Sequence, residues 1–226
     1  MNLIGKCCIV TGSTGALGNA VVHRLLSAGA QVAVINRGSV AASVAITMDN
    51  VDLADPQAAK QAIDAAASRL GGFYSLVNLA GAFRWETLAN GDVATWDLLY
   101  AANLKTAVCA CKAALPHLYK NGSGRIVSIG ASAATKAAAG MGAYAASKAG
   151  LAKLTEALSE EVKGNGITVN AVLPSIIDTP ANRRDLPRAD FGKWVKPEAI
   201  AGLIAFLLSD LASDITGALI PITGRS

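Results

Sequence analysis

The chain has 226 residues, of which 52% are hydrophobic and 16% are charged, and its formal net charge is +4. This length allows one domain with a substantial core. The basic residues are scattered, which excludes the concentrated basic stripe of a nucleic-acid-binding protein. No apolar run approaches the ~20 residues that span a bilayer, so we expect no membrane partner.

Apolar strands and amphipathic helices alternate from the start of the chain. Cys7–Thr11 (CCIVT) predicts a first buried strand, and apolar residues at helical spacing predict a helix over Asn19–Ala28. Gln31–Ile35 (QVAVI) predicts the second strand, and a third strand should precede Val51. An N-cap aspartate followed by a proline at the first helical position predicts the next helix, Pro56–Leu70.

The same alternation continues to the end of the chain. Further apolar strands are predicted at Tyr74–Leu79, Arg125–Ile129, Thr168–Leu173 and Ala218–Ile222, with long helices near Thr95–Lys120 and Tyr144–Lys163. Apolar strands alternating with helices predict a mainly parallel sheet covered by helices on both faces. No linker or repeat divides the chain. We therefore expect a single α/β domain over residues 1–226, of the doubly wound Rossmann type.

Four cysteines lie in apolar segments: Cys7, Cys8, Cys109 and Cys111. Their spacing matches neither a zinc site nor a redox motif. Reduced thiols in a protein core are typical of a cytoplasmic protein, and this is the location we expect. His23 and His117 are isolated in helical segments, so we expect no metal site.

A glycine-rich turn joins the first strand to the first helix. Glycines here let the backbone turn tightly and approach a pyrophosphate, which then lies at the positive end of the helix. The residues that we expect to hold a dinucleotide at this turn are Gly12, Ser13, Gly15, Ala16, Leu17 and Gly18.

The end of the second strand bears on which dinucleotide binds. An acidic residue there accepts hydrogen bonds from the ribose of NAD, whereas a nearby arginine accommodates the 2′-phosphate of NADP. This strand ends in Asn36 and Arg37, which favours NADP while leaving NAD possible; Arg37 as an ordinary solvated loop residue is the alternative. Asp52 and Leu53 follow the third strand, where Asp52 would reach the adenine amino group.

Tyr144 and Lys148 lie one helical turn apart and so share a helix face. A phenol has an unperturbed pKa of ~10, too high for ready proton exchange at neutral pH. A nearby ammonium favours the phenolate and lowers that pKa. The pair therefore predicts proton transfer by Tyr144, and Lys148 can also bind the ribose hydroxyls of the cofactor.

Together these features resemble the short-chain dehydrogenase/reductase family over essentially the whole chain. The resemblance implies that Tyr144 is the general acid/base, that Lys148 lowers its pKa, and that Asn103 holds a water connecting the lysine to solvent. It also implies hydride transfer on the B face of the nicotinamide and assembly into dimers or tetramers through two long helices. Further cofactor contacts are expected at Asn78, Ala80, Gly81, Pro174, Ile177 and Thr179.

The chain departs from the family pattern at the serine that hydrogen-bonds the substrate oxygen. That serine normally lies thirteen residues before the tyrosine, where this chain has Ala131, with Ser132 one residue later. Two interpretations remain: a shifted turn gives Ser132 the role, which we favour slightly, or the register holds and the donor is absent. The chain also resembles the dihydropteridine reductase branch, which has an alanine there and a substrate segment similar to residues 173–194.

The substrate loop of the family falls at about residues 175–196. It carries five basic residues, with Phe191 and Trp194 available to cover a ring. One interpretation is a lid that favours a flat or anionic substrate; the other is a solvated loop whose aromatic residues pack on the body of the protein.

Three functions follow from these observations. The first is an NAD(P)H-dependent oxidoreductase that transfers hydride to a small carbonyl or imine-like molecule. The second is activity like that of a quinonoid dihydropteridine reductase. The third is a non-catalytic dinucleotide sensor or scaffold, which the displaced serine suggests but the intact Tyr144 and Lys148 disfavour.

Overall fold

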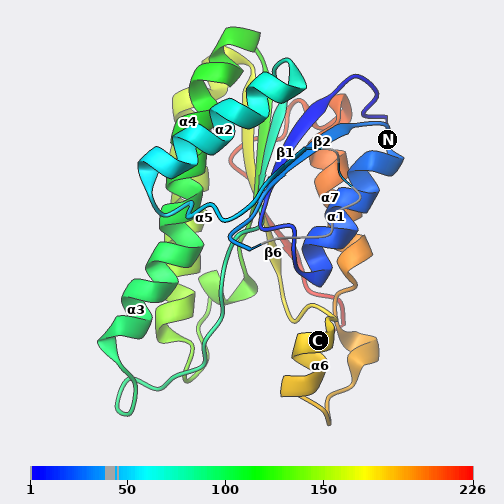
Figure 1. Cartoon of the computed structure of the whole chain (residues 1–226). Coiled ribbons are helices and arrows are strands. Elements are labelled where there is room, and N and C mark those ends of the chain that lie inside the picture. The colour runs from blue at the N-terminus through cyan, green and yellow to red at the C-terminus, as the bar shows by residue number, and fades with distance from the viewer. Residues whose placement is uncertain (1, 39–43, 45, 226) are drawn as a thin grey trace.

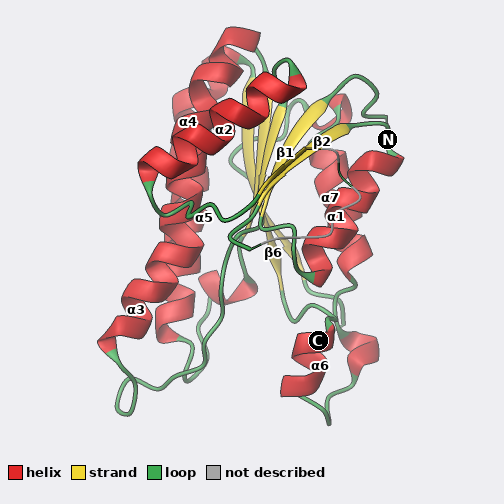
Figure 2. Cartoon of the chain, in the orientation of Figure 1, coloured by secondary structure: helices red, strands yellow, loops and turns green. Residues whose placement is uncertain are grey.

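The computed structural model describes residues 2–38, 44 and 46–225, and within them the strands form one parallel sheet (Figure 2). The strand order is β3-β2-β1-β4-β5-β6-β7. The strands are β1 (Cys7–Thr11), β2 (Gln31–Ile35), β3 (Ile46–Met48), β4 (Ser75–Asn78), β5 (Gly124–Ile129), β6 (Ile167–Pro174) and β7 (Leu219–Ile222). The predicted α/β doubly wound fold is confirmed.

Helices cover both faces of the sheet (Figure 1). On one face lie α1 (Ala16–Ser27) and α7 (Pro197–Leu207), which also pack against each other. On the other lie α2 (Pro56–Leu70), α4 (Thr106–Asn121) and α5 (Gly142–Val162). Two shorter helices, α3 (Val93–Tyr100) and α6 (Pro180–Asp185), extend beyond the carboxyl ends of the strands.

Alternating side chains build the two halves of the core. Cys8 and Val10 of β1 face α1 and α7, whereas Ile9 between them faces α2 and α4, as the two-residue period of a strand requires. The helix predicted at Pro56–Leu70 has those bounds. Its N-cap carboxylate, Asp55, accepts hydrogen bonds from the amides of Gln57 at 2.7 Å and Ala58 at 3.0 Å.

The helix predicted near Thr95–Lys120 is interrupted. A π-helical turn at Ala101–Lys105 joins α3 to α4. Such turns insert an extra residue into a helix and are frequent at functional sites. The run Val93–Asn121 is long and apolar enough to cross a bilayer by composition, but 44% of its most apolar stretch is buried within this domain. We interpret it as a core element.

The order of the strands fixes where a ligand can bind. The chain moves outward from β1 to β2 and β3, and then returns to β4 on the other side of β1. In open sheets of this type, ligands bind at the carboxyl ends of the strands where the order reverses. That point lies between Thr11 and Asn78, beside the glycine-rich turn.

Candidate active site

A cavity of about 830 Å³ opens at this reversal point. Ten residues predicted to bind a dinucleotide line it: Gly12, Gly15, Leu17, Gly18, Asn36, Arg37, Asp52, Leu53, Ala80 and Gly81. Binding cavities for small molecules and cofactors have volumes of roughly 300–1,000 Å³. The cavity is therefore large enough for a dinucleotide.

Glycines bring the walls of this cavity close together. Gly12 has φ +70°, and a Cβ there would lie 2.6 Å from the amide nitrogen of Ala80. A Cβ on Gly18 would lie 2.5 Å from the backbone of Ser13. By contrast, a Cβ on Gly15 would meet no heavy atom within 4 Å, so this residue leaves open space at the N-terminus of α1. A helix N-terminus with exposed amides suits the negative charge of a pyrophosphate.

Asn36 links the end of β2 to the glycine-rich turn. Its Oδ1 accepts hydrogen bonds from the Ser13 backbone amide at 2.8 Å and from the Ser13 hydroxyl at 3.1 Å. The amide nitrogen is an obligate donor, so the oxygen of Asn36 must face Ser13. Its Nδ2 is buried and has no hydrogen-bond partner among the described residues. The neighbouring Arg37 is exposed and lines the cavity.

Some predicted cofactor residues support the cavity from behind. Ser13 and Ala16 do not line it, and neither does Asn78. The side chain of Asn78 is buried and donates to Ser128 Oγ at 3.3 Å and Cys111 Sγ at 3.4 Å, tying β4 to its neighbours. Asp52 is exposed and lines the cavity, and its carboxylate accepts a hydrogen bond from the Ala54 amide.

Tyr144 and Lys148 lie in the first two turns of α5; Lys148 is buried and Tyr144 is partly buried. Burial disfavours the charged form of each group. It raises the pKa of Tyr144 to about 12 and lowers the pKa of Lys148 to about 8. The lysine Nζ donates to the carbonyl oxygen of Ile129 at 2.7 Å and lies 6.0 Å from the centroid of the tyrosine ring.

The expected lowering of the Tyr144 pKa is therefore reversed in this structure. Desolvation dominates, because the lysine ammonium points to the Ile129 carbonyl instead of the phenol oxygen. A lysine with a pKa near 8 can gain or lose a proton close to neutral pH, which suits a group that passes protons to a tyrosine.

Asn103 lies in the π-helical turn and is almost completely buried. Its Oδ1 accepts the Ala82 amide at 2.8 Å, and its Nδ2 donates to the Ala82 carbonyl at 3.0 Å and to Ser147 Oγ at 3.0 Å. The hydroxyl of Ser147 in turn donates to the Tyr144 carbonyl at 2.7 Å. These contacts tie the segment after β4 to the helix that carries the tyrosine and the lysine.

Ser132 opens a short helical turn, Ser132–Ala134, that packs against α5. Its hydroxyl donates to the carbonyl oxygen of Leu173 at 3.3 Å. The preceding residue, Ala131, is extended and buried. The structure thus gives the Ser132 hydroxyl a backbone partner, which counts against our sequence-based preference for Ser132 as the substrate's hydrogen-bond donor.

Pro174 ends β6, and the substrate loop begins after it. Ile177 pairs with Val195 in an isolated parallel bridge, so the two ends of the loop are joined. Thr179 is the N-cap of α6, and its hydroxyl oxygen accepts the Asn182 amide at 3.1 Å. The hydroxyl proton of Thr179 remains available for a ligand.

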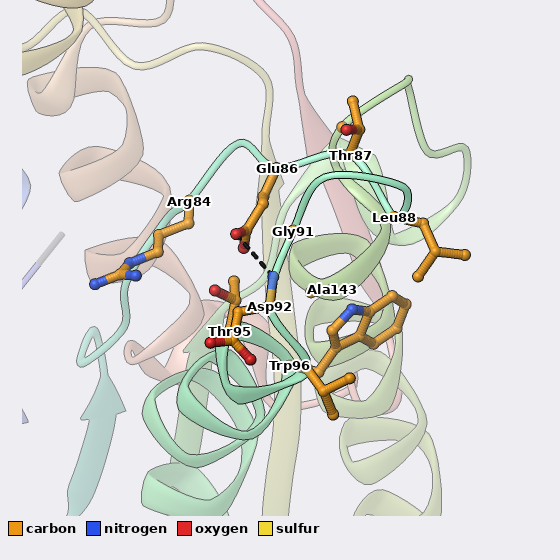
Figure 3. Close-up of a pocket in the computed structure, with 11 residues that line it drawn as sticks. Arg84, Glu86, Thr87, Leu88, Gly91, Asp92, Thr95, Trp96 and Ala143 are labelled. Atoms are coloured by element: carbon orange, nitrogen blue, oxygen red, sulfur yellow. Dashed lines mark hydrogen bonds between the residues drawn. The ribbon is translucent and has the colours of Figure 1, made fainter.

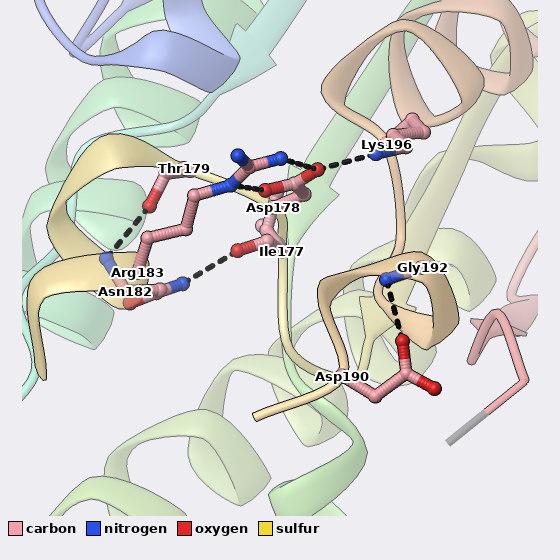
Figure 4. A network of polar contacts seen from close by, with 8 residues as sticks. All are labelled: Ile177, Asp178, Thr179, Asn182, Arg183, Asp190, Gly192 and Lys196. Atoms are coloured by element: carbon pink, nitrogen blue, oxygen red, sulfur yellow. Dashed lines mark hydrogen bonds and ion pairs between the residues drawn. The ribbon is translucent and has the colours of Figure 1, made fainter. Parts of the chain in front are cut away.

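Asp178 clamps the base of the loop (Figure 4). Its side chain is 6% exposed and accepts hydrogen bonds from Arg183 Nε at 2.5 Å and Nη2 at 2.8 Å. Lys196, at the other end of the loop, forms an ion pair with the same carboxylate. The Arg183 guanidinium also lies 4.8 Å from the ring centroid of Phe191. One carboxylate therefore holds both ends of the segment.

Replacing Asp178 with Asn should loosen this loop. The two cations hold the pKa of Asp178 well below its usual range. A depressed folded-state pKa contributes stability above the ordinary carboxyl range, and this is lost only as pH falls through the folded-state value. At neutral pH we expect faster hydrogen exchange over residues 177–196 in Asp178→Asn, with exchange in β1 and β4 unchanged. Equal exchange rates over residues 177–196 in the wild type and in Asp178→Asn would show that the Asp178 ion pairs do not order the loop.

The aromatic residues of the loop pack within it. Trp194 is buried, and the ring of Phe191 lies 4.8 Å from it, centroid to centroid. This packing favours the interpretation in which the two aromatic residues pack on the protein over the one in which they cover a substrate ring. Two of the five basic residues, Arg183 and Lys196, are paired with Asp178 and are not free to attract an anion.

The thiols do not form a reactive site. Burial raises the pKa of Cys8 to about 11 and that of Cys111 to about 12, and all four cysteines are free. Among the residues that the structure describes, no group of three or more His, Cys, Asp or Glu side chains is placed to hold a metal. His117 contacts Asp64 at 2.7 Å on the surface.

Sequence reasoning missed several residues at the site. Phe83 and Arg84 line the cavity, and Ser147 supports Asn103. The position of Phe83 and Arg84 in the sequence could have indicated their role, because they lie a few residues after the carboxyl end of β4, a central parallel strand. Ser147 adjoins Lys148, but nothing in its spacing indicates a partner in the π-helical turn.

Comparisons with known proteins agree with this geometry. The model of the short chain dehydrogenase family matches residues 6–189. The 4-formylbenzenesulfonate dehydrogenase of Comamonas testosteroni is 32% identical over 99% of this chain and 98% of its own length. The 3-oxoacyl-acyl-carrier-protein reductase of Thermotoga maritima is 31% identical over the same shares. A short-chain dehydrogenase/reductase from Serratia marcescens superposes with a TM-score of 0.89 at 32% identity, covering 100% of this chain and 99% of that one.

Proposed function

Because the chain belongs to the short-chain dehydrogenase/reductase family and is an NAD(P)-dependent oxidoreductase, we propose that it reduces a small carbonyl compound with NADPH. The observation that carries this proposal is that Asn103 and Tyr144 contact residues of a dinucleotide-sized cavity: Asn103 is hydrogen-bonded to Ala82, and the Tyr144 ring packs against Phe83. Lys148 lies one helical turn after Tyr144. The relatives named above act on carbonyl groups by their names, one on an aldehyde and one on a 3-oxoacyl group.

The residues present fit a dinucleotide. Gly15 leaves room at the N-terminus of α1. Gly12 and Gly81 let neighbouring protein segments pack closely, since a Cβ on Gly12 would lie 2.6 Å from the Ala80 nitrogen and one on Gly81 would lie 2.7 Å from Asn103 Oδ1. The unpartnered Nδ2 of Asn36 is a buried donor at the wall of the cavity, and Arg37 adds a positive charge beside it. Two donors at this point suit a phosphate, whereas a carboxylate would suit two ribose hydroxyls.

When bound, a reduced nicotinamide supplies the hydride. Tyr144 would donate its hydroxyl proton to the carbonyl oxygen of the substrate as the carbonyl carbon is reduced, so that an alcohol would form. Lys148 Nζ lies 6.0 Å from the centroid of the Tyr144 ring and is hydrogen-bonded to the Ile129 carbonyl; turned from that carbonyl toward the phenol oxygen, its positive charge would stabilise the phenolate that remains. Lys148, with its pKa near 8, then returns a proton toward the tyrosine. Asn103 holds the backbone around Ala82 and the start of α5 in register for this transfer.

A second candidate substrate is a quinonoid dihydropterin. The observation favouring it is the Ser132 hydroxyl, which is directed at the Leu173 carbonyl and leaves Tyr144 as the proposed donor to the substrate. A conjugated imine needs less polarisation than an isolated ketone. Oxidation of NADPH with aldehydes, ketones, quinones and a quinonoid dihydropterin distinguishes the candidates. Turnover of the pterin alone would replace the carbonyl proposal, and turnover of none would contradict both.

The preference for NADP depends on Arg37. Hydrogen bonds to charged groups contribute about 1.5–3 kcal/mol, so Arg37→Ala should weaken NADPH binding by a factor of about 12 to 150. NADH lacks the 2′-phosphate, and its affinity should not change. Calorimetric titration of both nucleotides measures this, with Arg69→Ala as the control, since Arg69 is exposed on α2 away from the cavity. Equal losses for the two nucleotides would refute the assignment.

We also propose that the protein is a cytoplasmic homodimer or homotetramer. Among the described residues, six large apolar side chains remain 38–75% exposed along the continuous segment of α3 and α4: Val93, Trp96, Leu98, Tyr100, Val108 and Tyr119. A second copy packing along these helices would remove this surface from water.

A further inference from the structure

The ring of Phe83 lies against the ring of Tyr144. Their centroids are 4.9 Å apart, and the planes meet at 84°, an edge-to-face arrangement. Phe83 also lines the large cavity, and its side chain is 54% exposed. An exposed aromatic side chain beside the proposed proton donor is available to a substrate.

The backbone on the N-terminal side of Phe83 is held by Asn103. This side chain both accepts from the Ala82 amide and donates to the Ala82 carbonyl, at 2.8 and 3.0 Å. These two hydrogen bonds engage the peptide groups on both sides of Ala82, and so restrain the position and the orientation of this residue. The backbone of the residue before Phe83 is therefore held in place.

The backbone on the C-terminal side is held by the segment that leads into α5. Trp85 Nε1 donates to the Ala139 carbonyl at 2.9 Å, and the Glu86 amide donates to the Gly140 carbonyl at 2.8 Å. The indole of Trp85 lies directly on Gly140, where a Cβ would come within 2.2 Å of it. Because this segment precedes Tyr144 by only a few residues, these contacts fix Phe83 relative to the tyrosine.

The rest of the loop is also braced (Figure 3). The Glu86 carboxylate accepts the Asp92 amide at 3.0 Å, which closes the loop, and Trp96 lies beside Ala143 on α5. Phe83 is thus part of a rigid wall. Its ring is presented at the site without the entropy cost of ordering a mobile segment.

We propose that Phe83 is a specificity-determining residue that selects carbonyl substrates bearing an aromatic ring. The proposal rests on the proposed carbonyl reductase function. A substrate oxygen within hydrogen-bond reach of Tyr144 places the adjoining substituent next to Phe83, since the two rings are in contact. A flat ring can stack on Phe83 or meet it edge to face, and such aromatic pairs are stabilised beyond the area they bury.

The test compares two aldehydes of matched size, benzaldehyde and cyclohexanecarbaldehyde. The measured quantity is the ratio of their kcat/KM values, and intrinsic reactivity cancels when variants are compared with the wild type. Phe83→Leu should lower the ratio about 2- to 13-fold, the range of aromatic pair contributions, while Phe83→Tyr keeps it. Leu88→Ala is the matched control, because Leu88 lies in the same loop, is 81% exposed and does not line the large cavity.

A binding measurement covers the case in which neither aldehyde is reduced. Saturation-transfer NMR compares benzyl alcohol with cyclohexylmethanol on the protein with and without NADP. A preference for benzyl alcohol that Phe83→Leu removes would support the role of Phe83. If neither aldehyde is reduced, that result counts against the carbonyl reductase function and leaves the binding result as the test of Phe83. An aromatic preference that is missing, unchanged in Phe83→Leu, or equally reduced in Leu88→Ala would overturn the proposal.

Discussion

Replacing Tyr144 with Phe should lower kcat for carbonyl reduction about 10²- to 10⁴-fold, the usual contribution of a positioned general acid. The substitution removes only the hydroxyl, so the ring stays packed against Phe83 and α5 keeps its contacts. Affinity for NADPH, measured by fluorescence titration, should therefore change little. The rate of NADPH oxidation under saturating conditions gives kcat directly.

A second tyrosine provides the control for this prediction. Tyr119 is 43% exposed on α4 and makes no contact with the cavity, so Tyr119→Phe should keep full activity. If Tyr144→Phe also kept its activity, another group would have to deliver the proton, and Ser132 would be the first to examine. A loss of NADPH affinity as large as the loss of kcat would instead point to a binding role for the hydroxyl.

The substitutions Gly18→Ala and Gly15→Ala should separate effects on protein stability from effects on cofactor binding. A Cβ on Gly18 meets the backbone of Ser13 at 2.5 Å, and backbone cannot rotate away. We expect Gly18→Ala to lower the free energy of unfolding by about 1–3 kcal/mol and to abolish tight NADPH binding. A Cβ on Gly15 meets nothing within 4 Å, so Gly15→Ala should cost about 1 kcal/mol or less.

Gly15→Ala should nevertheless weaken NADPH binding. Its new methyl group projects into open space beside the N-terminus of α1, where the pyrophosphate is proposed to lie. A loss of about 5- to 150-fold corresponds to 1–3 kcal/mol of crowding. Gly202→Ala, on α7 and also free of neighbours within 4 Å, should stabilise the helix and leave binding unchanged. Full NADPH affinity in Gly15→Ala would place the pyrophosphate elsewhere.

The fold could be predicted from local patterns because its strands are buried on both faces. Each strand is a short apolar run, and each helix shows its own period, so the α/β alternation is visible without tertiary information. The same patterns do not determine where each helix begins and ends. The helix predicted from Asn19 begins at Ala16, because the glycine-rich turn enters it earlier than the apolar period shows. The π-helical turn at Ala101–Lys105 leaves no mark on the apolar pattern.

The site could be predicted only where spacing along one element decides geometry. Tyr144 and Lys148 share a helix face, and the glycines lie on one turn, so their proximity follows from local structure. The partners of Asn103 and Ser132 come from segments distant in sequence. The pKa of Tyr144 depends on burial by several such segments, which explains why local reasoning gave the wrong direction for this structure. The position of Phe83 likewise depends on contacts of the flanking residues with segments distant in sequence, and no motif indicates these contacts.

The central claim is that this protein transfers hydride to a carbonyl carbon while Tyr144 supplies the proton. The most direct measurement follows deuterium from NADPH labelled on the B face of its nicotinamide into the alcohol product, detected by mass spectrometry with benzaldehyde and the other carbonyl substrates. We expect one deuterium at the former carbonyl carbon with the wild type and almost none with Tyr144→Phe. Binding of NADPH with no deuterium in any product would contradict the claim and indicate a dinucleotide-binding protein without this chemistry.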